Sequence, residues 1–250
     1  MKFLLRIQYL GTNFCGWQYQ PGVRTVQKTL TDAAAALFGA PCRITGCSRT
    51  DSGVHALDFA ASLEVPTGAN AVPPDKIPAA LAFYLPHDLS VKSASPVCAD
   101  FHPRYDVVYK EYIYKIHTAA AEDPFLYGRV WHLPGAWMPD AAERMNACAN
   151  VLVGRHDFIS FMAAGSKITD TVRTVHHCAV EYRDGLLELR IAADGFLYNM
   201  VRIIAGTLTQ AGFGKLSEQQ MNAILHARDR TAAGITAPPE GLYLKEVFYG

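Results

Sequence analysis

The sequence lacks the paired cysteines that cross-link secreted domains or bind zinc. Its six cysteines are scattered along 250 residues, and no two of them form a C-x-x-C pair. Isolated cysteines of this kind are typical of free thiols in a reducing compartment. No apolar run approaches the roughly 18 residues of a membrane span, and Arg6 interrupts the apolar start of the chain too early for a signal peptide. We therefore expect a soluble, cytoplasmic protein with no membrane partner.

Motifs for nucleotide, metal and serine-hydrolase sites are also absent. Thr209 and Leu216 occupy the positions around Gly214 where a phosphate-binding loop needs Gly and Ser or Thr. Neither H-E-x-x-H nor G-x-S-x-G occurs. The run His176-His177-Cys178 falls in a predicted strand, where adjacent side chains point to opposite faces and do not converge on a metal. The sequence therefore gives no sign of an ATP or metal site.

An excess of either charge is missing as well. Lys and Arg number 23, Asp and Glu number 23, and charged residues make up 18% of a chain that is 50% hydrophobic. This composition is typical of a globular protein and not of a disordered one. Because no global positive field exists, any surface that binds nucleic acid must be a local patch.

Hydrophobic spacing in the first half predicts alternating strands and helices. Apolar residues alternate with polar ones from Lys2 to Tyr9, which is the period of a strand with one buried face. Thr25 is placed to cap a helix that runs to Phe38, and Gly39 is placed to end it. A strand is expected at 59–65, a short helix after Pro74 and a closing strand at 89–97.

The second half repeats this order of elements. A strand around 112–116 precedes a helical apolar stripe at 141–152, and Asp184-Gly185 favours a tight hairpin because both positions tolerate positive φ. Helices are expected at 200–211 and after the capping-box residue Ser217, and a final strand at 242–249.

The repeated order predicts an α+β fold of two tandem split-βαβ lobes, similar to ferredoxin or RRM lobes. The sheets should be largely antiparallel, with helices on one face and a central cleft between the lobes. Residues 99–106 are the natural seam, so we divide the chain into an N-terminal lobe, 1–105, and a C-terminal lobe, 106–250.

One polar segment, at 47–56, differs from its surroundings. It reads Cys-Ser-Arg-Thr-Asp-Ser-Gly-Val-His-Ala and separates two apolar runs. Asp, Ser and Gly are common turn formers, so an ordinary turn is one interpretation. The other is that Asp51 is a nucleophile on a tight loop, kept ionised by a nearby guanidinium. Polar composition does not decide between them.

The segment resembles the G-R-T-D-x-G-V-H-A signature of tRNA pseudouridine synthase A, the TruA-type enzyme family. Further segments agree with that family in order along the chain. They are Tyr9-Leu10-Gly11-Thr12 with Gly16-Trp17-Gln18; Phe101-His102-Pro103-Arg104-Tyr105 with Tyr112 and Tyr114; His156-Asp157-Phe158; Gly195-Phe196-Leu197-Tyr198 with Met200-Val201-Arg202; and Ala237-Pro238-Pro239-Glu240-Gly241-Leu242-Tyr243-Leu244. The resemblance spans nearly the whole chain and implies the pseudouridine synthase fold.

The resemblance implies an isomerase that converts uridine to pseudouridine in tRNA. The expected targets are positions 38, 39 and 40 (tRNA numbering) of the anticodon arm, and no cofactor is required. Asp51 is the implied nucleophile, acting where the uracil ring joins the ribose. The resemblance also implies a homodimer in which two subunits hold one tRNA.

The resemblance implies substrate contacts for five further residues. Arg202 is expected to orient the nucleophile as its ion-pair partner, and Tyr112 to stack on the target base or assist removal of its C5 proton. Arg49 is expected to fill the space that the flipped nucleotide leaves, or to contact the RNA backbone. Leu242 and Leu244 resemble the apolar wall against the uracil, although a core strand accounts for them equally well.

A local basic patch would reconcile tRNA binding with a neutral chain. The candidates are Arg49, Arg104, Arg155, Lys167, Arg173 and Arg202. His55, Phe14 and Trp17 either meet RNA or pack in the core, and the sequence does not choose.

Three positions depart from the family pattern. Ser48 replaces a usual Gly, Asn199 stands where His is frequent, and Pro103 replaces a common Ala. They leave Arg49 and Asp51 unchanged and bear on the fine geometry of the site and on substrate positioning. Two other functions fit the residues alone: an RNA-binding module without catalysis, and a hydrolase that uses Asp51 as a general base and releases uracil.

Overall fold

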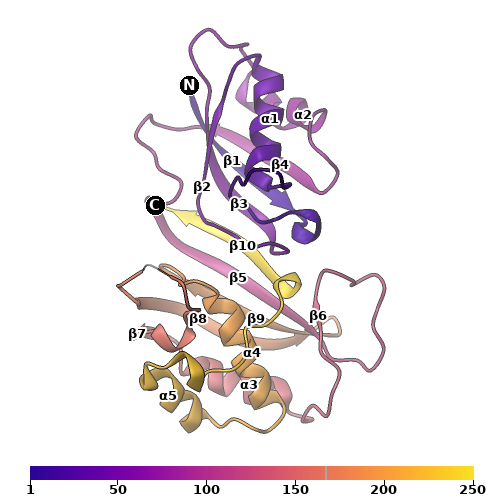
Figure 1. The fold of residues 1–250 in the computed structure, drawn as a ribbon, viewed down its shortest axis with the longest axis vertical. Coiled ribbons are helices and arrows are strands. Elements are labelled where there is room, and N and C mark those ends of the chain that lie inside the picture. The colour runs from indigo at the N-terminus through magenta and orange to yellow at the C-terminus, as the bar shows by residue number, and fades with distance from the viewer. Residues whose placement is uncertain (167) are drawn as a thin grey trace. The chain divides into compact units, whose positions relative to one another are not determined.

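The chain folds into two units in the computed structural model, which describes residues 1–166 and 168–250. Unit 1 consists of Met1–Val108 and Tyr243–Gly250, and unit 2 consists of Tyr109–Leu242 (Figure 1). The sequence-based division assigned residues 243–250 to the second lobe. They group with unit 1 because the last strand pairs with a strand of that unit.

Unit 1 is built on a mostly antiparallel sheet. Strand β1 (Lys2–Tyr9) lies between β3 (His55–Glu64) and β4 (Leu89–Pro96) and is antiparallel to both. Strand β2 (Arg43–Gly46) pairs with β3 in the antiparallel sense, whereas β10 (Leu242–Tyr249) pairs with β3 in parallel. The sheet therefore brings the start of β10 beside the start of β3, directly after the Asp51 segment.

Helix α1 (Val26–Phe38) forms where its capping residues predict it. The Thr25 hydroxyl oxygen accepts from the Lys28 N–H at 3.4 Å, and Gly39 ends the helix with φ of 65°. Its face toward the core is fully buried at Leu30. Burial of a side chain of this size contributes about 1.5–3 kcal/mol. Helix α2 (Ile77–Ala82) lies beside α1 and packs against β4 (Figure 1).

Unit 2 has its own antiparallel sheet. Its neighbours in order are β5 (Val107–His117), β9 (Leu186–Ala193), β8 (Val172–Arg183) and β7 (Gly154–Asp157). The short strand β6 (Trp131–His132) pairs in parallel with β5. Antiparallel neighbours joined by short connections need no crossover, which matches the hairpin between β8 and β9.

Three helices pack together in unit 2. Helix α3 (Ala141–Asn150) contacts β8, α4 (Met200–Gly212) and α5 (Glu218–Ala227) (Figure 1). Helix α4 is buried along most of its length, which explains why its sequence is apolar on nearly every face. Helix α5 begins at the capping box of Ser217 and Gln220 that the sequence predicts.

The α+β class and the largely antiparallel sheets predicted from the sequence are confirmed. The turn at Asp184-Gly185 is also confirmed, with φ of 49° and 81°. Strand β7 is an element that the sequence analysis does not predict, and it forms by pairing with β8. Among the described residues, no helix has the length and apolarity needed to cross a membrane.

Candidate active site

The Asp51 loop (residues 47–54) connects β2 to β3 in unit 1 and is fixed by backbone hydrogen bonds. The Trp17 N–H donates to the Thr50 carbonyl at 3.1 Å, and the Gly53 N–H donates to the Phe14 carbonyl at 3.3 Å. The Val54 N–H donates to the Asp51 carbonyl at 3.2 Å, which closes a turn directly after the carboxylate. The backbone on both sides of Asp51 is therefore anchored to the segment that contains the first family-like motif.

Two glycines allow this segment to approach the Asp51 loop closely. A Cβ added at Gly11 would lie 2.0 Å from the Val54 carbonyl oxygen, and one at Gly16 would lie 2.6 Å from the Thr50 carbonyl oxygen. Gly16 also has φ of 79°, in the left-handed region that side chains disfavour. These positions accept only glycine because backbone lies against backbone there.

Side chains add two further links to the loop. The Tyr9 hydroxyl shares a 2.9 Å hydrogen bond with the Thr50 hydroxyl. The Gly11 N–H donates to His55 Nδ1 at 2.9 Å, and His55 is fully buried. The sequence left His55 unassigned, and the structure gives it a role in packing and hydrogen bonding beside Asp51.

The aromatic residues of the opening motif belong to the core. Trp17 and Phe14 are 2% and 1% exposed, and Trp17 stacks on Phe59 with ring centroids 4.1 Å apart. Gly46 makes room for this indole, since a Cβ there would lie 2.5 Å from it. Packing, which was one of the two sequence-based alternatives for these residues, is the one the structure supports.

At the end of this network, Asp51 is half-buried and Arg49 is exposed. The carboxylate therefore stands on a rigid backbone while its side chain reaches the surface in part. This is the arrangement expected of a reactive group, because a fixed position lowers the entropic cost of alignment with a substrate.

Strand β10 lies next to the loop. Tyr243 and Leu244 are the register partners of His55 and Ala56, and the Tyr243 ring stacks on the His55 ring at 4.6 Å. Leu242 is 7% exposed and Leu244 is fully buried. Alternate residues of a strand share a face, so the two leucines point the same way from β10.

Tyr112 lies on β5 in unit 2 and is 6% exposed. Its ring packs edge-on against Phe196, with centroids 4.9 Å apart and an angle of 80° between the planes. Phe196 belongs to the segment that leads into α4, so the family-like motifs around Tyr112 and Arg202 meet in this unit.

Arg202 lies in the first turn of α4 and is held at two of its nitrogens. Its Nε donates to the Ala237 carbonyl at 2.7 Å, and its Nη1 donates to Asn199 Oδ1 at 2.9 Å. In return, the Ala237 N–H donates to the Arg202 carbonyl at 3.1 Å. The segment at 237 is thus bound to α4 from both sides.

The turn between residues 237 and 242 is held by Tyr114. The Tyr114 hydroxyl donates to the Pro238 carbonyl at 2.7 Å, and Gly241 lies against its ring. Burial raises the pKa of Tyr114 above its ordinary value, and the charge of Glu240 adds to this effect. The phenol therefore stays protonated and keeps donating throughout the neutral range.

The predicted site residues fall into two groups. Arg49, Asp51 and Leu244 belong to unit 1, and Tyr112, Arg202 and Leu242 belong to unit 2. The predicted pairing of Asp51 with Arg202 stays a prediction. Among the residues that the structure describes, no cluster of three His, Cys, Asp or Glu side chains could hold a metal ion.

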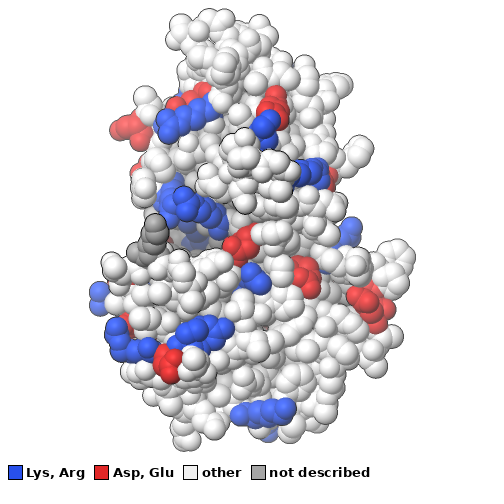
Figure 2. All heavy atoms as spheres, viewed as in Figure 1, with Lys and Arg blue, Asp and Glu red and all other residues white. Residues whose placement is uncertain are grey.

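Basic side chains lie in several small groups on the face shown in Figure 2, interspersed with acidic ones. Arg49, Arg104 and Arg155 are exposed, whereas Arg173 and Arg202 are half-buried. Lys167, the remaining candidate for a basic patch, lies outside the described residues.

Comparisons with known proteins agree with this reading of the motifs. A family model described as tRNA pseudouridine synthase matches residues 6–106 and 148–250, which include Asp51 and Arg202. A protein named tRNA pseudouridine synthase A from Bacillus subtilis (strain 168) is 43% identical over 252 residues, covering 100% of this chain and 99% of the relative.

Other proteins of the same name are similar to a comparable degree. One from Bacillus pumilus (strain SAFR-032) is 42% identical over 251 residues, covering 100% of this chain and 99% of its own. One from Thermoanaerobacter sp. (strain X514) is 42% identical over 246 residues, covering 98% of each chain. Since both the family model and these relatives match far more than half of its length, the chain belongs to the tRNA pseudouridine synthase family.

Proposed function

We propose that the protein isomerises uridine to pseudouridine in the anticodon arm of tRNA, at positions 38, 39 and 40, with Asp51 as the nucleophile. The observation that carries this proposal is the anchoring of the Asp51 loop. Backbone bonds from Trp17 and Gly53 hold the residues on both sides of a half-buried carboxylate. An ordinary surface turn would need neither these bonds nor the glycine contacts at 11 and 16.

The reaction rearranges bonds without any net change in composition. The N1–C1′ glycosidic bond breaks, the uracil turns while it stays bound, and C5 joins C1′ as its proton is lost and N1 gains one. No oxidant, reductant or metal enters this balance, which is why we assign no cofactor. The carboxylate can attack C1′, attack C6 or support charge on the ribose while a glycal forms.

Arg202 is the proposed ion-pair partner that orients Asp51. A guanidinium is always charged and presents its donors in a planar fork, which suits it to hold a carboxylate in one orientation. Its two bonds to Asn199 and Ala237 fix that fork before substrate arrives.

Tyr112, Leu242 and Leu244 are the proposed contacts of the uracil, and Arg49 the proposed contact of the RNA at the site that the base vacates. Extruding a base from a stem costs a few kcal/mol. Stacking on one aromatic ring recovers about 1–3 kcal/mol per base. One tyrosine therefore offsets much of the cost of extrusion.

The chain as a whole fits tRNA recognition by a limited number of phosphate contacts. Unit 2 is proposed to complete the site that unit 1 begins with Asp51. We further propose a cytoplasmic homodimer, because a second copy doubles the basic surface available to one tRNA on a chain of zero net charge.

Asp51→Asn tests the proposed nucleophile. The substitution keeps the size of the side chain and removes its charge, so we expect turnover to fall by at least about 10³-fold while tRNA affinity stays within about threefold. Single-turnover kinetics on undermodified tRNA and filter binding measure the two effects. Asp58→Asn is the matched control, since Asp58 is also half-buried in unit 1 but pairs with Arg6 and Lys92.

Two outcomes contradict the proposal. Wild-type turnover in Asp51→Asn excludes the Asp51 carboxylate as the nucleophile. Loss of a base from the wild-type product, seen as a fall in RNA mass, identifies a hydrolase, because isomerisation leaves the mass unchanged.

A further inference from the structure

Asn199 has an unusual backbone at the start of α4. It is the residue that precedes the helix, and its φ of 59° and ψ of 12° lie in the left-handed region. Few side chains tolerate that region, and Asn, Asp and His are the commonest among those other than glycine. The backbone geometry therefore restricts this position to a small set of residues.

The Asn199 side chain does not cap the helix. Residues in this position usually bond the N–H groups of the first turn, but no such bond is formed here. Instead, Asn199 Oδ1 accepts from Arg202 Nη1 at 2.9 Å, while the Asn199 carbonyl accepts from the Ile203 N–H at 2.9 Å. The backbone carbonyl of Asn199 accepts the first hydrogen bond of the helix, and its side-chain amide oxygen accepts from the Arg202 guanidinium.

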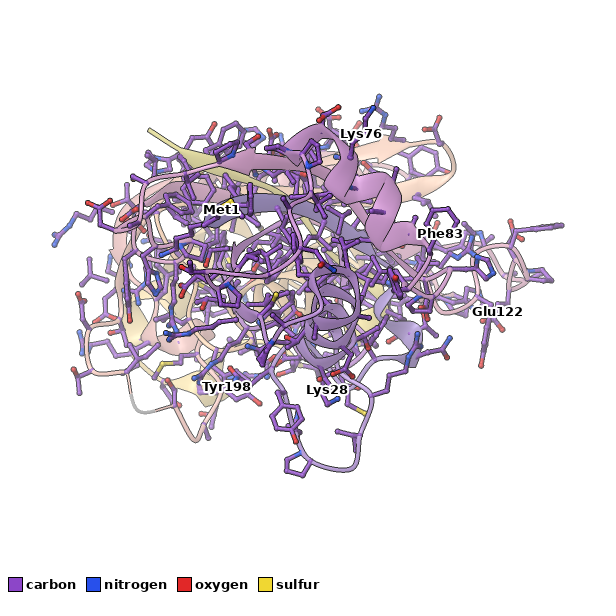
Figure 3. The ribbon with its side chains drawn as sticks, turned by 90° about the horizontal axis from the view of Figure 1, so that it is seen from above. Met1, Lys28, Lys76, Phe83, Glu122 and Tyr198 are labelled. Carbon is purple, nitrogen blue, oxygen red and sulfur yellow. The ribbon has the colours of Figure 1, made fainter. Side chains whose placement is uncertain are left out.

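The left-handed backbone is what makes this contact available. Asn199 follows Tyr198, which is 47% exposed at the surface of unit 2 and labelled in Figure 3, and precedes Met200, which is 1% exposed. The chain turns at Asn199 from the surface into the core. The Tyr198 carbonyl is held by the Ala163 N–H at 3.0 Å, so the approach to this turn is anchored too.

Asn199 and Ala237 together restrain the plane of the Arg202 guanidinium. Two acceptors on different nitrogens of a planar group define its orientation, which one acceptor alone leaves free to rotate. The Ala237 acceptor is a backbone carbonyl and is present whatever the side chain at 237. Asn199 Oδ1 is a side-chain acceptor, so a substitution at position 199 changes this contact with Arg202 directly.

We propose that Asn199 is a positioning residue for the isomerisation, setting the orientation of Arg202 and so the rate of the chemical step. This rests on the proposed role of Arg202. The residue acts through the guanidinium and makes no contact with the substrate in this proposal. Where the family often has His, this protein has Asn199. In this proposal the substitution changes the chemical group that accepts from Arg202 but keeps an acceptor at this position.

Asn199→Gly separates the side chain from the backbone. Glycine keeps the left-handed conformation without strain and removes the side chain together with its Oδ1 acceptor. We expect kcat on undermodified tRNA to fall about tenfold or more with KM within about threefold, because a misdirected group affects the transition state more than binding. Asp tolerates the same left-handed backbone and keeps an oxygen acceptor at this position. The kcat of Asn199→Asp should therefore lie within about threefold of wild type.

Arg202→Ala and the double variant Asn199→Gly/Arg202→Ala complete the experiment. If Asn199 acts through Arg202, adding Asn199→Gly to Arg202→Ala lowers kcat no further. All rates are normalised to the concentration of folded protein, measured by circular dichroism and by titration with tRNA.

The outcomes separate the inference from the role it rests on. Wild-type kcat in Arg202→Ala overturns the proposed role of Arg202, and with it the inference. Loss of activity in Arg202→Ala with unchanged kcat in Asn199→Gly overturns the inference alone. The same holds if Asn199→Asp is as slow as Asn199→Gly, or if the two losses multiply in the double variant.

Discussion

At the scale of single residues, His55 shows how one buried side chain restrains the loop that carries Asp51. Its Nδ1 accepts from the Gly11 N–H at 2.9 Å, and its ring stacks on Tyr243. An acceptor at Nδ1 places the ring proton of the neutral imidazole on Nε2. His55 therefore connects the opening motif, the end of the Asp51 loop and β10.

Replacing His55 by Leu should destabilise the protein. The substitution fills a similar volume but leaves the buried Gly11 N–H without its acceptor, which costs about 1–3 kcal/mol of the free energy of unfolding. Urea denaturation measures the loss. His55→Asn is the control, because an amide oxygen can occupy the place of Nδ1 and should restore part of the stability. Equal stability of His55→Leu and wild type would show that the bond is unimportant.

Much of this residue-level detail lies beyond the reach of the sequence. Asp51, Arg49 and Arg202 are proposed as site residues through motifs, because a motif records residue identity at fixed spacing. The hydrogen bond between His55 and Gly11 cannot be predicted in this way, because the two residues are 44 positions apart. The bond between Asn199 and Arg202 cannot either, because a single left-handed φ leaves no periodic signal in the sequence. Asn199 appears in the sequence only as a departure from His.

At the scale of elements, the contact between the opening segment and the Asp51 loop depends on glycine. Gly16 and Gly22 share φ of 79°, but their surroundings differ. A Cβ at Gly16 would lie 2.6 Å from a backbone oxygen, whereas nothing lies within 4 Å of one at Gly22. Comparing substitutions at Gly16 and Gly22 therefore separates the energetic cost of a left-handed backbone from the cost of a steric clash with the Asp51 loop.

Gly16→Ala should therefore be more harmful than Gly22→Ala. Both variants pay about 1–2 kcal/mol for a left-handed alanine. Gly16→Ala must also displace the backbone of the Asp51 loop, so we expect it to lose at least about 1 kcal/mol more and to lower turnover as well. Thermal unfolding and single-turnover rates test this. The same stability and activity in both variants would contradict the close packing of the two segments.

The elements that the sequence predicts well are those with local signals. The cap at Thr25, the end of α1 at Gly39 and the hairpin at Asp184-Gly185 each depend on residues within a few positions of one another. Strand β7 depends on pairing with β8 across residues 158–171, and β10 pairs in parallel with β3, which lies far earlier in the chain. Strand β7 has only four residues, and β10 has only two register pairs with β3. Segments this short do not show enough alternation of apolar and polar residues to predict which strand they pair with.

At the scale of the whole molecule, a neutral chain must recognise a polyanion through a few well-placed cations. Basic and acidic side chains are mixed on the surface seen in Figure 2, and the net charge is zero. Affinity should then depend on a small number of phosphate contacts and on the shape of the RNA. The balanced composition predicts that any basic surface is a local patch, but it does not identify the phosphate contacts.

Asp51 is the proposed nucleophile at the junction of sugar and base in the anticodon arm of a tRNA. The most direct test of this role is to incubate wild-type protein and Asp51→Asn with undermodified tRNA, without metal or nucleotide, and to map pseudouridine by carbodiimide-dependent reverse-transcription stops. We predict stops at positions 38, 39 and 40 for the wild type and none for Asp51→Asn. Stops at other positions, or the same stops with Asp51→Asn, would contradict the account.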